Sequence, residues 1–434
     1  MFLRKILFLL LVLPLLLMSC GNKEKFNLNQ TSLFVVSDIH YLADKLHDEG
    51  SLYTELVEEG DGKNMYVQAP LLAALKSTIE RDKPKVLLVT GDLTFNGAKR
   101  SHKDLADYFK EVEEGGTQVY VIPGNHDINN PRALTFYKDK AFPSKSITPY
   151  DFKKIYKDFG YKGALSYDKD SLSYLIEPIE GIQVLMVDSN KYSNNKVLGN
   201  PVQGGFIRPS TLAWMGDLVA KAHGDNKQIF VAMHHSLIKH NPMVSEGFTI
   251  DDSDKLQEQF LDWNIPMVLT GHIHIQDIIQ KSLGDRKIYD VATNALSVYP
   301  HQYGRISFGP SAWHYEAHPV DVETWAKEND IEDDQLRNFP QYSRDFFIKL
   351  SNLMVDKSVN TDAIDEETLE EIKKWTGESN ADFFAGREGE TPIDIPGIDE
   401  KARSWINPFL ENYLDSIKED GTPPDNDLYI ELNL

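Results

Sequence analysis

Short apolar runs alternate with amphipathic stretches along the chain from Thr31 to about His318. An alternation of this kind is typical of an α/β domain, in which strands and helices pack as layers. Six of the apolar runs have the length and composition of buried strands. These runs are "LFVV" (33–36), "KVLLV" (85–89), "QVYVI" (118–122), "QVLMV" (183–187), "QIFVAM" (228–233) and "PMVL" (266–269).

Amphipathic helices are predicted between these strands, over residues 69–84, 101–116 and 208–224. The first has four apolar residues on one face and ends at Pro84. The second opens with Ser101 and Asp104 at the spacing of a capping box. Two later segments, 278–293 and 305–318, have the pattern of hairpins that extend a sheet.

The chain changes character after His318. From Pro319 to Leu434 it carries 11 Lys and Arg against 29 Asp and Glu, which is −18 of the total net charge of −22. Apolar residues recur there at helical spacing, so we expect an acidic helical domain over 319–434. The charges are expected to form a solvated face, and nothing favours binding to a nucleic acid polymer. With 434 residues, 41% of them hydrophobic, the chain can bury a large core beside this domain.

The N-terminus has the pattern of a secretory signal. Arg4 and Lys5 precede an apolar run, residues 6–18, which is too short for a comfortable membrane-spanning helix. The only cysteine of the chain, Cys20, follows that run directly, and this resembles a bacterial lipoprotein signal. We therefore expect a signal peptide over 1–20, a polar tether over 21–30, and an extracytoplasmic protein anchored to the bacterial cell membrane through lipidated Cys20. An ordinary signal peptide with an incidental cysteine is the alternative.

Five of the six apolar runs end in residues that bind metals or transfer protons. The clusters are Asp38 and His40, then Asp92, then Asn125, His126 and Asp127, then His234 and His235, and finally His272 and His274. In an extended chain, residues i and i+2 face the same way, so the first pair is predicted to project together. Each cluster alone has an ordinary explanation as a turn or a polar loop. Because ligand sites form outside the carboxyl ends of strands in open α/β sheets, their joint occurrence predicts a metal site.

The blocks "SDIH", "GDLTFNG", "GNHD", "MHHS" and "GHIH" together resemble the calcineurin-like metallophosphoesterase family. The resemblance covers roughly Leu33 to His318, taken as a domain over 31–318. It implies a four-layer α/β/β/α sandwich, to which the C-terminal helical domain is appended. It also implies two metal ions: Asp38, His40 and His274 would hold the first, Asn125, His234 and His272 would hold the second, and Asp92 would bridge them.

Nitrogen and oxygen ligands without a thiolate suit manganese, iron or zinc, and ligand type does not choose among these metals. Two such cations about 3.5 to 4 Å apart clamp a phosphoryl group and lower the pKa of a water between them, which becomes the attacking hydroxide. His126 adjoins a ligand but is not one in the family pattern. We expect it to donate a proton or a hydrogen bond to the leaving oxygen, with Asp127 orienting it.

Two features depart from the family pattern or leave it ambiguous. An acidic insert, residues 43–66, lies between the first two blocks, either as a flap beside the site or as a surface excursion, and the excursion is slightly favoured because loops tolerate insertions. His235 adjoins His234, and either imidazole could be the ligand. The family pattern favours His234 and leaves His235 near the substrate.

The substrate is expected to be a small phosphoester. The blocks most resemble those of cyclic nucleotide and glycerophosphodiester phosphodiesterases, so we predict a phosphodiesterase, with cyclic nucleotides as the leading substrates. A broad phosphomonoesterase or nucleotidase is the alternative. A third interpretation is a non-catalytic surface lipoprotein with a structural metal site, which would lack an open coordination position. Nothing in the sequence indicates the oligomeric state.

Overall fold

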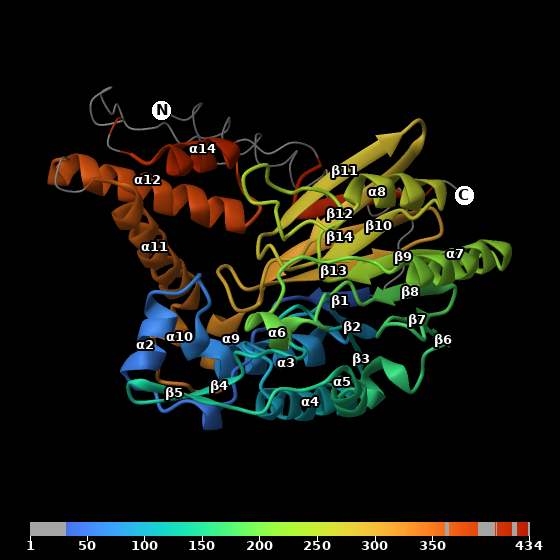
Figure 1. Ribbon diagram of the computed structural model, residues 1–434, viewed down its shortest axis with the longest axis horizontal. Helices are drawn as coiled ribbons and strands as arrows, with labels where there is room; N and C mark the ends of the chain where they lie inside the picture. The colour runs from blue at the N-terminus through green and yellow to red at the C-terminus, as the bar shows by residue number, and fades with distance from the viewer. Residues whose placement is uncertain (1–31, 361–363, 389–403, 405, 419–422, 433–434) are drawn as a thin grey trace, which may run out of the picture.

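The computed structural model describes residues 32–360, 364–388, 404, 406–418 and 423–432. The predicted signal peptide, Cys20 and the tether lie outside these residues, so the lipoprotein interpretation stays a prediction. Within the described part of the chain, no helix combines the length and the apolar character needed to cross a membrane. The described residues form two β-sheets with helices on their outer faces (Figure 1).

The first sheet has six strands in the order β15-β14-β13-β1-β2-β3. Its strands are β1 (Ser32–Val36), β2 (Val86–Val89), β3 (Gln118–Val121), β13 (Gln302–Phe308), β14 (Ala312–Pro319) and β15 (Asp427–Glu431). β1, β2 and β3 are parallel, so their carboxyl ends lie at one edge. Helices α3 (Gln68–Asp82) and α4 (Lys99–Glu114) pack on this sheet through buried side chains such as Leu75 and Leu105.

The second sheet has seven strands in the order β11-β12-β10-β9-β8-β7-β6. Its strands are β6 (Ser166–Tyr167), β7 (Tyr174–Ile179), β8 (Ile182–Val187), β9 (Gln228–Met233), β10 (Met267–Thr270), β11 (Asp277–Leu283) and β12 (Arg286–Ala292). The central strands β8, β9, β10 and β12 are parallel. Helices α7 (Pro209–Gly224) and α8 (Ser253–Asp262) cover the outer face.

Strand β8 shows how the layers arise from the sequence. Successive side chains of a strand point to opposite faces. Val184 and Met186 therefore join the core shared with the first sheet, whereas Leu185 and Val187 join the core under α7 and α8. All four are buried. The order helix, sheet, sheet, helix follows, and the predicted α/β/β/α sandwich is confirmed.

The predicted start of α4 is wrong. The helix begins at Lys99, two residues before Ser101, and Ala98 at its N-cap offers no side-chain acceptor. The Ser101 hydroxyl instead accepts a hydrogen bond from the backbone N–H of Ala43 at 3.0 Å, and Asp104 pairs with Arg100. The Ser101 hydroxyl therefore makes a tertiary hydrogen bond in place of the helix-capping bond that the sequence pattern predicts.

The segments that connect the main strands and helices contain short helices and one hairpin. These are η1 (Asp44–Leu46), α2 (Ser51–Glu58), η2 (Met65–Val67), the hairpin of β4 (Leu134–Tyr137) and β5 (Lys140–Pro143), α5 (Pro149–Ile155), η3 (Lys157–Tyr161) and α6 (Asn195–Leu198). The first three belong to the acidic insert 43–66. Tyr53, Val57 and Met65 are buried there in a cluster with Phe136. The insert is thus a packed part of the domain, and the favoured surface excursion is wrong.

The chain beyond His318 is mostly helical in its described residues. Its helices are α9 (Val322–Glu328), α10 (Asp334–Arg337), α11 (Phe339–Ser358), α12 (Glu366–Phe384) and α14 (Pro408–Ser416). Figure 1 shows α11, α12 and α14 beside one end of the two sheets. The expectation of helices alone in this region is incomplete, because β15 pairs antiparallel with β14 and buries Leu428 and Ile430. The end of the chain therefore returns to the first sheet.

Candidate metal centre

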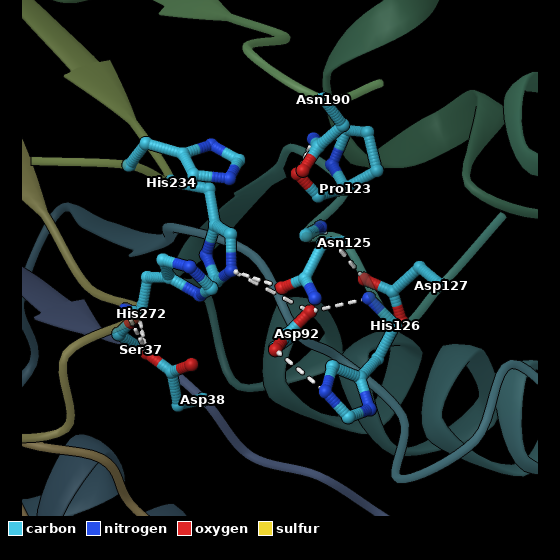
Figure 2. Close-up of polar contacts among 12 residues, drawn as sticks. Ser37, Asp38, Asp92, Pro123, Asn125, His126, Asp127, Asn190, His234 and His272 are labelled. Atoms are coloured by element: carbon cyan, nitrogen blue, oxygen red, sulfur yellow. Dashed lines mark hydrogen bonds and ion pairs between the residues drawn. The ribbon is translucent and has the colours of Figure 1, made fainter. Parts of the chain in front are cut away.

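The predicted site residues lie just beyond the carboxyl ends of five strands. Asp38 and His40 follow β1, Asp92 follows β2, Asn125 and His126 follow β3, His234 follows β9, and His272 and His274 follow β10. Figure 2 shows several of these side chains pointing toward one another from both sheets. The two parallel sets of strands end at the same edge of the sandwich, and the site lies there.

Five of these residues have left-handed backbone conformations. The φ angles are +51° at Asp38, +47° at His40, +45° at Asp92, and +69° at both His272 and His274. Such conformations are rare outside glycine and cost about 1–3 kcal/mol each, so they cluster where function requires them. The expectation that Asp38 and His40 project together from an extended strand is wrong in its mechanism, because both residues follow β1 with left-handed φ angles.

Glycines permit the close approach of these turns. A Cβ on Gly124 would lie 2.1 Å from both the backbone nitrogen and Oδ1 of Asp92. A Cβ on Gly271 would lie 1.8 Å from the Ser37 hydroxyl oxygen. Neither distance is compatible with a side chain at the glycine. The motifs therefore contain glycine because one ligand turn packs directly against another.

The first donor group consists of Asp38, His40 and His274. The Nε2 atoms of His40 and His274 lie 3.2 Å apart, and Asp38 Oδ1 lies 3.6 Å and 3.4 Å from them. The other carboxylate oxygen of Asp38 accepts hydrogen bonds from the Ser37 hydroxyl and from the backbone N–H of His272. One oxygen is thus fixed by the protein while the other faces the two imidazoles.

The second donor group consists of Asn125, His234 and His272. The Nδ1–H of His234 donates to the Thr90 carbonyl at 2.9 Å, and the Nε2–H of His272 donates to the Gly247 carbonyl at 3.0 Å. In the neutral rings these bonds place the proton on His234 Nδ1 and His272 Nε2, so His234 Nε2 and His272 Nδ1 are the nitrogens that can bind a metal ion. The amide oxygen of Asn125 lies 3.2 Å from His234 Nε2.

Asp92 lies between the two groups. Its Oδ2 is 3.6 Å from His40 Nε2, and its Oδ1 is 3.5 Å from His234 Nε2. Potential ligand atoms of His40, Asp92 and His126 fall in one cluster, and those of Asp92, His234 and His272 fall in another. The carboxylate therefore presents one oxygen to each group, which is the geometry of a bridging ligand.

The electrostatic environment differs from one imidazole to the next. Burial opposes a charge on His234, yet the carboxylates of Asp92 and Asp38 outweigh it and raise its pKa to about 9. Burial, and after it the charge of Lys63, lowers the pKa of His40 to about 3. For the carboxylate of Asp92 burial acts in the opposite direction and raises the pKa. The charges of His126 and then His234 outweigh it and hold the pKa of Asp92 well below the usual range. The centre thus keeps anionic carboxylates among buried imidazoles.

His126 lies at the open side of the centre, with 31% of its side chain exposed. Its Nδ1–H donates to the Phe95 carbonyl at 2.7 Å, and its Nε2 lies 3.8 Å from Asp92 Oδ2. The expected role of Asp127 in orienting this ring is wrong. The Asp127 carboxylate instead accepts hydrogen bonds from the backbone N–H groups of Leu93, Thr94 and Gly124 at 2.9–3.0 Å, and so ties two ligand loops together.

The structure also separates the two adjacent histidines. His235 is buried, its Nε2–H donates to the Gln203 carbonyl at 2.8 Å, and its Nδ1 accepts from the Ser189 hydroxyl at 2.8 Å. Both ring nitrogens are occupied, so His235 does not face the donor groups. It holds the loop around Gln203 rather than lying beside a substrate.

Sequence reasoning did not find the groups that orient the ligands. The carbonyls of Thr90, Phe95 and Gly247 leave no signal in a sequence, because every residue has a carbonyl. Lys63 was also missed, since it belongs to the acidic insert and no periodicity distinguishes it. The predicted ligand roles themselves stay predictions, although the described side chains are brought together as those roles require.

Comparisons with known proteins agree with this geometry. The family model described as calcineurin-like phosphoesterase matches residues 31–276, and the model described as C-terminal domain of cyclic nucleotide phosphodiesterase matches residues 321–423. A probable cyclic nucleotide phosphodiesterase of Synechococcus sp. is 25% identical over 215 residues, which are 48% of this chain. The alignment spans 65% of that relative, which is less than two thirds of its length.

Two solved structures resemble the described fold at low sequence identity. A dimetal phosphatase from Danio rerio is 12% identical, with a TM-score of 0.49, over 67% of this chain and 96% of its own. A putative 5'-nucleotidase from Staphylococcus aureus is 14% identical, with a TM-score of 0.40, over 73% of this chain and 58% of its own. Neither likeness bears on the substrate.

Proposed function

Because this chain belongs to the calcineurin-like phosphoesterase family, we propose that it hydrolyses phosphodiesters and that cyclic nucleotides are its substrates. The protein is a metal-dependent phosphoester hydrolase. The observation that carries the proposal is the position of Asp92, whose two carboxylate oxygens face two separate donor groups. The match of residues 321–423 to a domain of cyclic nucleotide phosphodiesterases supports the choice of a diester.

The donor atoms fit two cations. Asp38 Oδ1 is buried without a hydrogen-bond donor, and the Nε2 atoms of His40 and His274 face each other at 3.2 Å. Two imidazole nitrogens and a carboxylate oxygen that converge in this way fit a cation between them. The absence of a thiolate among them favours manganese, iron or zinc. When bound, such ions offset charge on the phosphoryl oxygens and lower the pKa of a water.

Among the residues of this chain, His126 is the group that we expect to donate a proton to the leaving oxygen. Because its Nδ1–H donates a hydrogen bond to the Phe95 carbonyl, the ring presents Nε2 to the open side of the centre. Nε2, which lies 3.8 Å from Asp92 Oδ2, delivers a proton when both ring nitrogens carry one. We propose that His126 protonates the leaving alkoxide as the phosphodiester bond breaks.

The first experiment compares hydrolysis of bis(p-nitrophenyl) phosphate and p-nitrophenyl phosphate by protein that starts at residue 21. The protein is stripped with a chelator and reloaded with manganese, iron or zinc, and 3',5'- and 2',3'-cyclic nucleotides follow as substrates. We expect metal-dependent turnover with a preference for the diester. Asp92→Ala should abolish it, whereas Asp107→Ala, an exposed aspartate on α4, should not.

Each other outcome identifies a different function. Preference for the monoester would make the protein a phosphomonoesterase or nucleotidase. Tight metal binding without turnover of any ester would favour the non-catalytic protein with a structural metal site. Turnover that survives Asp92→Ala would contradict the bridging role of this carboxylate.

A further inference from the structure

We propose that Lys63, carried by the acidic insert, binds the anionic phosphoryl oxygen of the substrate, and that Asp61 holds its ammonium when no phosphate is bound. This inference rests on the proposed function, because it names the group that recognises the phosphate at that site. It makes Lys63 a substrate-binding residue for phosphoesters. It also gives the insert 43–66 a role at the site, in line with the flap that is the less favoured interpretation of its sequence.

The turn that carries Lys63 is linked to the first donor group, because the N–H of Asn64 donates to the Ser297 carbonyl and the Ser297 hydroxyl donates to the Asp38 carbonyl. The side chain of Lys63 is only 5% exposed, and its ammonium forms an ion pair with the carboxylate of Asp61. Burial is the largest cause that lowers the pKa of the His40 imidazole, and the positive charge of Lys63 is the second largest. Burial would raise the pKa of Asp61, but Lys63 and then His274 lower it.

The two members of this ion pair differ in their surroundings. Asp61 is 68% exposed, whereas Lys63 is almost completely enclosed. The carboxylate of Asp61 can turn into solvent and be hydrated there, because most of its surface is already exposed. The ammonium has no such alternative, since a buried charge requires a partner. A phosphate that enters the centre supplies that partner.

The charge of Lys63 also requires an anion once metal ions are bound. An ammonium beside a dication is repelled, and a single carboxylate at the rim offsets only part of this repulsion. A bound phosphodiester brings a negative charge between the cations and the lysine. An ammonium with three donors is well suited to a phosphoryl oxygen, which accepts hydrogen bonds from several directions.

Two anchors fix the backbone on either side of Lys63. On one side, Gly62 has a φ of +96°, and a Cβ there would lie 3.3 Å from Val298 and 3.4 Å from Phe347 on α11. On the other side, the N–H of Asn64 donates to the Ser297 carbonyl at 2.9 Å. The hydroxyl of Ser297 in turn donates to the backbone carbonyl of the ligand Asp38 at 2.9 Å.

These anchors connect Lys63 to the metal centre and to the C-terminal helices. One hydrogen-bonded residue, Ser297, separates the backbone of Asn64 from that of Asp38. On the far side of the insert, Lys349 of α11 forms a 2.7 Å ion pair with Glu58 of α2, and Figure 1 shows the two helices side by side. The backbone around Lys63 is thus held by contacts with two parts of the chain, which is more than a surface loop without a role requires.

The alternative is a buried ion pair with a structural role only. Phosphate binding and stability separate the two. We would titrate the manganese-loaded protein, starting at residue 21, with inorganic phosphate by calorimetry. Lys63→Met, which keeps the length of the side chain, should weaken phosphate binding by about 10- to 100-fold, as expected when a hydrogen bond to a charged group is lost. Lys45→Met, an exposed lysine of the same insert, is the matched control and should bind like the wild type.

Asp61→Asn distinguishes the two roles even if Lys63→Met proves unstable. It leaves the lysine in place and removes the charge that competes with phosphate, so phosphate binding should be unchanged or tighter. Weakening by Asp61→Asn similar to that of Lys63→Met would overturn the proposal and make the pair structural. Wild-type affinity in Lys63→Met would also overturn it.

Activity gives a second readout that separates this inference from the proposed function. With bis(p-nitrophenyl) phosphate, Lys63→Met should raise KM more than it lowers kcat, and the bound manganese should stay at the wild-type amount. If the wild type hydrolyses no ester, the proposed function fails, while the phosphate titration still decides whether Lys63 binds an anion.

Discussion

At the scale of single residues, the site depends on hydrogen bonds that sort similar side chains into different roles. His234 and His235 are neighbours, yet a bond from Nδ1 to the Thr90 carbonyl turns the first toward the donor groups. Two bonds to Gln203 and Ser189 hold the second away from them. The tautomer and direction of each imidazole follow from its partner, and not from its place in the motif.

His126 offers a direct test of such a role. His126→Ala should reduce hydrolysis of esters with alkyl leaving groups by about 100-fold or more, because an alkoxide needs a proton as it departs. Nitrophenyl esters should lose much less, since nitrophenolate leaves without one. Kinetics on methyl p-nitrophenyl phosphate and on a cyclic nucleotide measure the two cases.

A matched comparison comes from Asp127→Asn. Its carboxylate accepts hydrogen bonds from the ligand loops and does not touch the imidazole of His126, so this substitution should lower the activity on both kinds of ester alike. Equal losses for His126→Ala on alkyl and nitrophenyl esters would rule out the proton donor.

The sequence was sufficient to predict which residues reach the site, but not how they are held there. The glycines and the ligand types are visible in the motifs because a missing Cβ and a donor atom are properties of a residue. The left-handed turns at Asp38 and His272 are not visible, since non-glycine residues seldom adopt them. The role of Asp127 was missed for a similar reason: its partners are backbone N–H groups.

At the scale of elements, a buried cluster connects the hairpin of β11 and β12 to the loop after β9. His240 Nδ1 lies 2.6 Å from Asp277 Oδ2, and its Nε2 lies 3.3 Å from Asp290 Oδ2. Asp290 also accepts from the N–H of Ile238 and from the hydroxyl of Thr270. Burial opposes the charge on His240, but Asp290 and then Asp277 raise its pKa to about 10.

This cluster predicts a pH dependence of stability. Because the pKa of His240 is higher in the folded state than in the unfolded state, its contribution is complete below about pH 6.5 and is lost as the pH rises toward 10. His240→Gln should therefore reduce the free energy of unfolding most at pH 7, on the order of a few kcal/mol, and least at pH 10. Denaturant titrations of chelator-treated protein at pH 7, 8.5 and 10 measure this difference.

The control is His223→Gln, which removes an exposed histidine whose Nε2 contacts only the Trp263 carbonyl at 2.9 Å among its described polar partners. Its effect should be small and independent of pH. A destabilisation by His240→Gln that stays constant from pH 7 to 10 would show that His240 is not held as a cation by the two aspartates.

At the scale of the whole molecule, the sandwich could be predicted because its strands read as separate apolar runs in chain order. The return of the chain to the first sheet could not. β15 is a five-residue alternation inside a strongly acidic region, and its pairing with β14 depends on residues more than a hundred positions away. The packing of the insert against α11 was missed for the same reason, since both faces belong to segments distant in sequence.

The contact between α11 and the insert predicts that the C-terminal helices influence substrate binding. Phe347 is 5% exposed, and its ring lies 5.7 Å from that of Tyr299 and against the position of Gly62. Phe347→Ala should destabilise the protein by about 3–5 kcal/mol and should also weaken phosphate binding, because it removes the support beneath Lys63.

Phe383→Ala provides the matched control, because Phe383 is 6% exposed in another core cluster of the same helices and is not among the contacts of Gly62. It should cost similar stability while phosphate binding stays at the wild-type level. Thermal unfolding and phosphate titration of both variants at 25 °C, where each is folded, separate the two effects. If both variants bind phosphate like the wild type, α11 stabilises the fold without shaping the site; if only Phe347→Ala weakens binding, the C-terminal region helps to determine which phosphoesters the centre accepts.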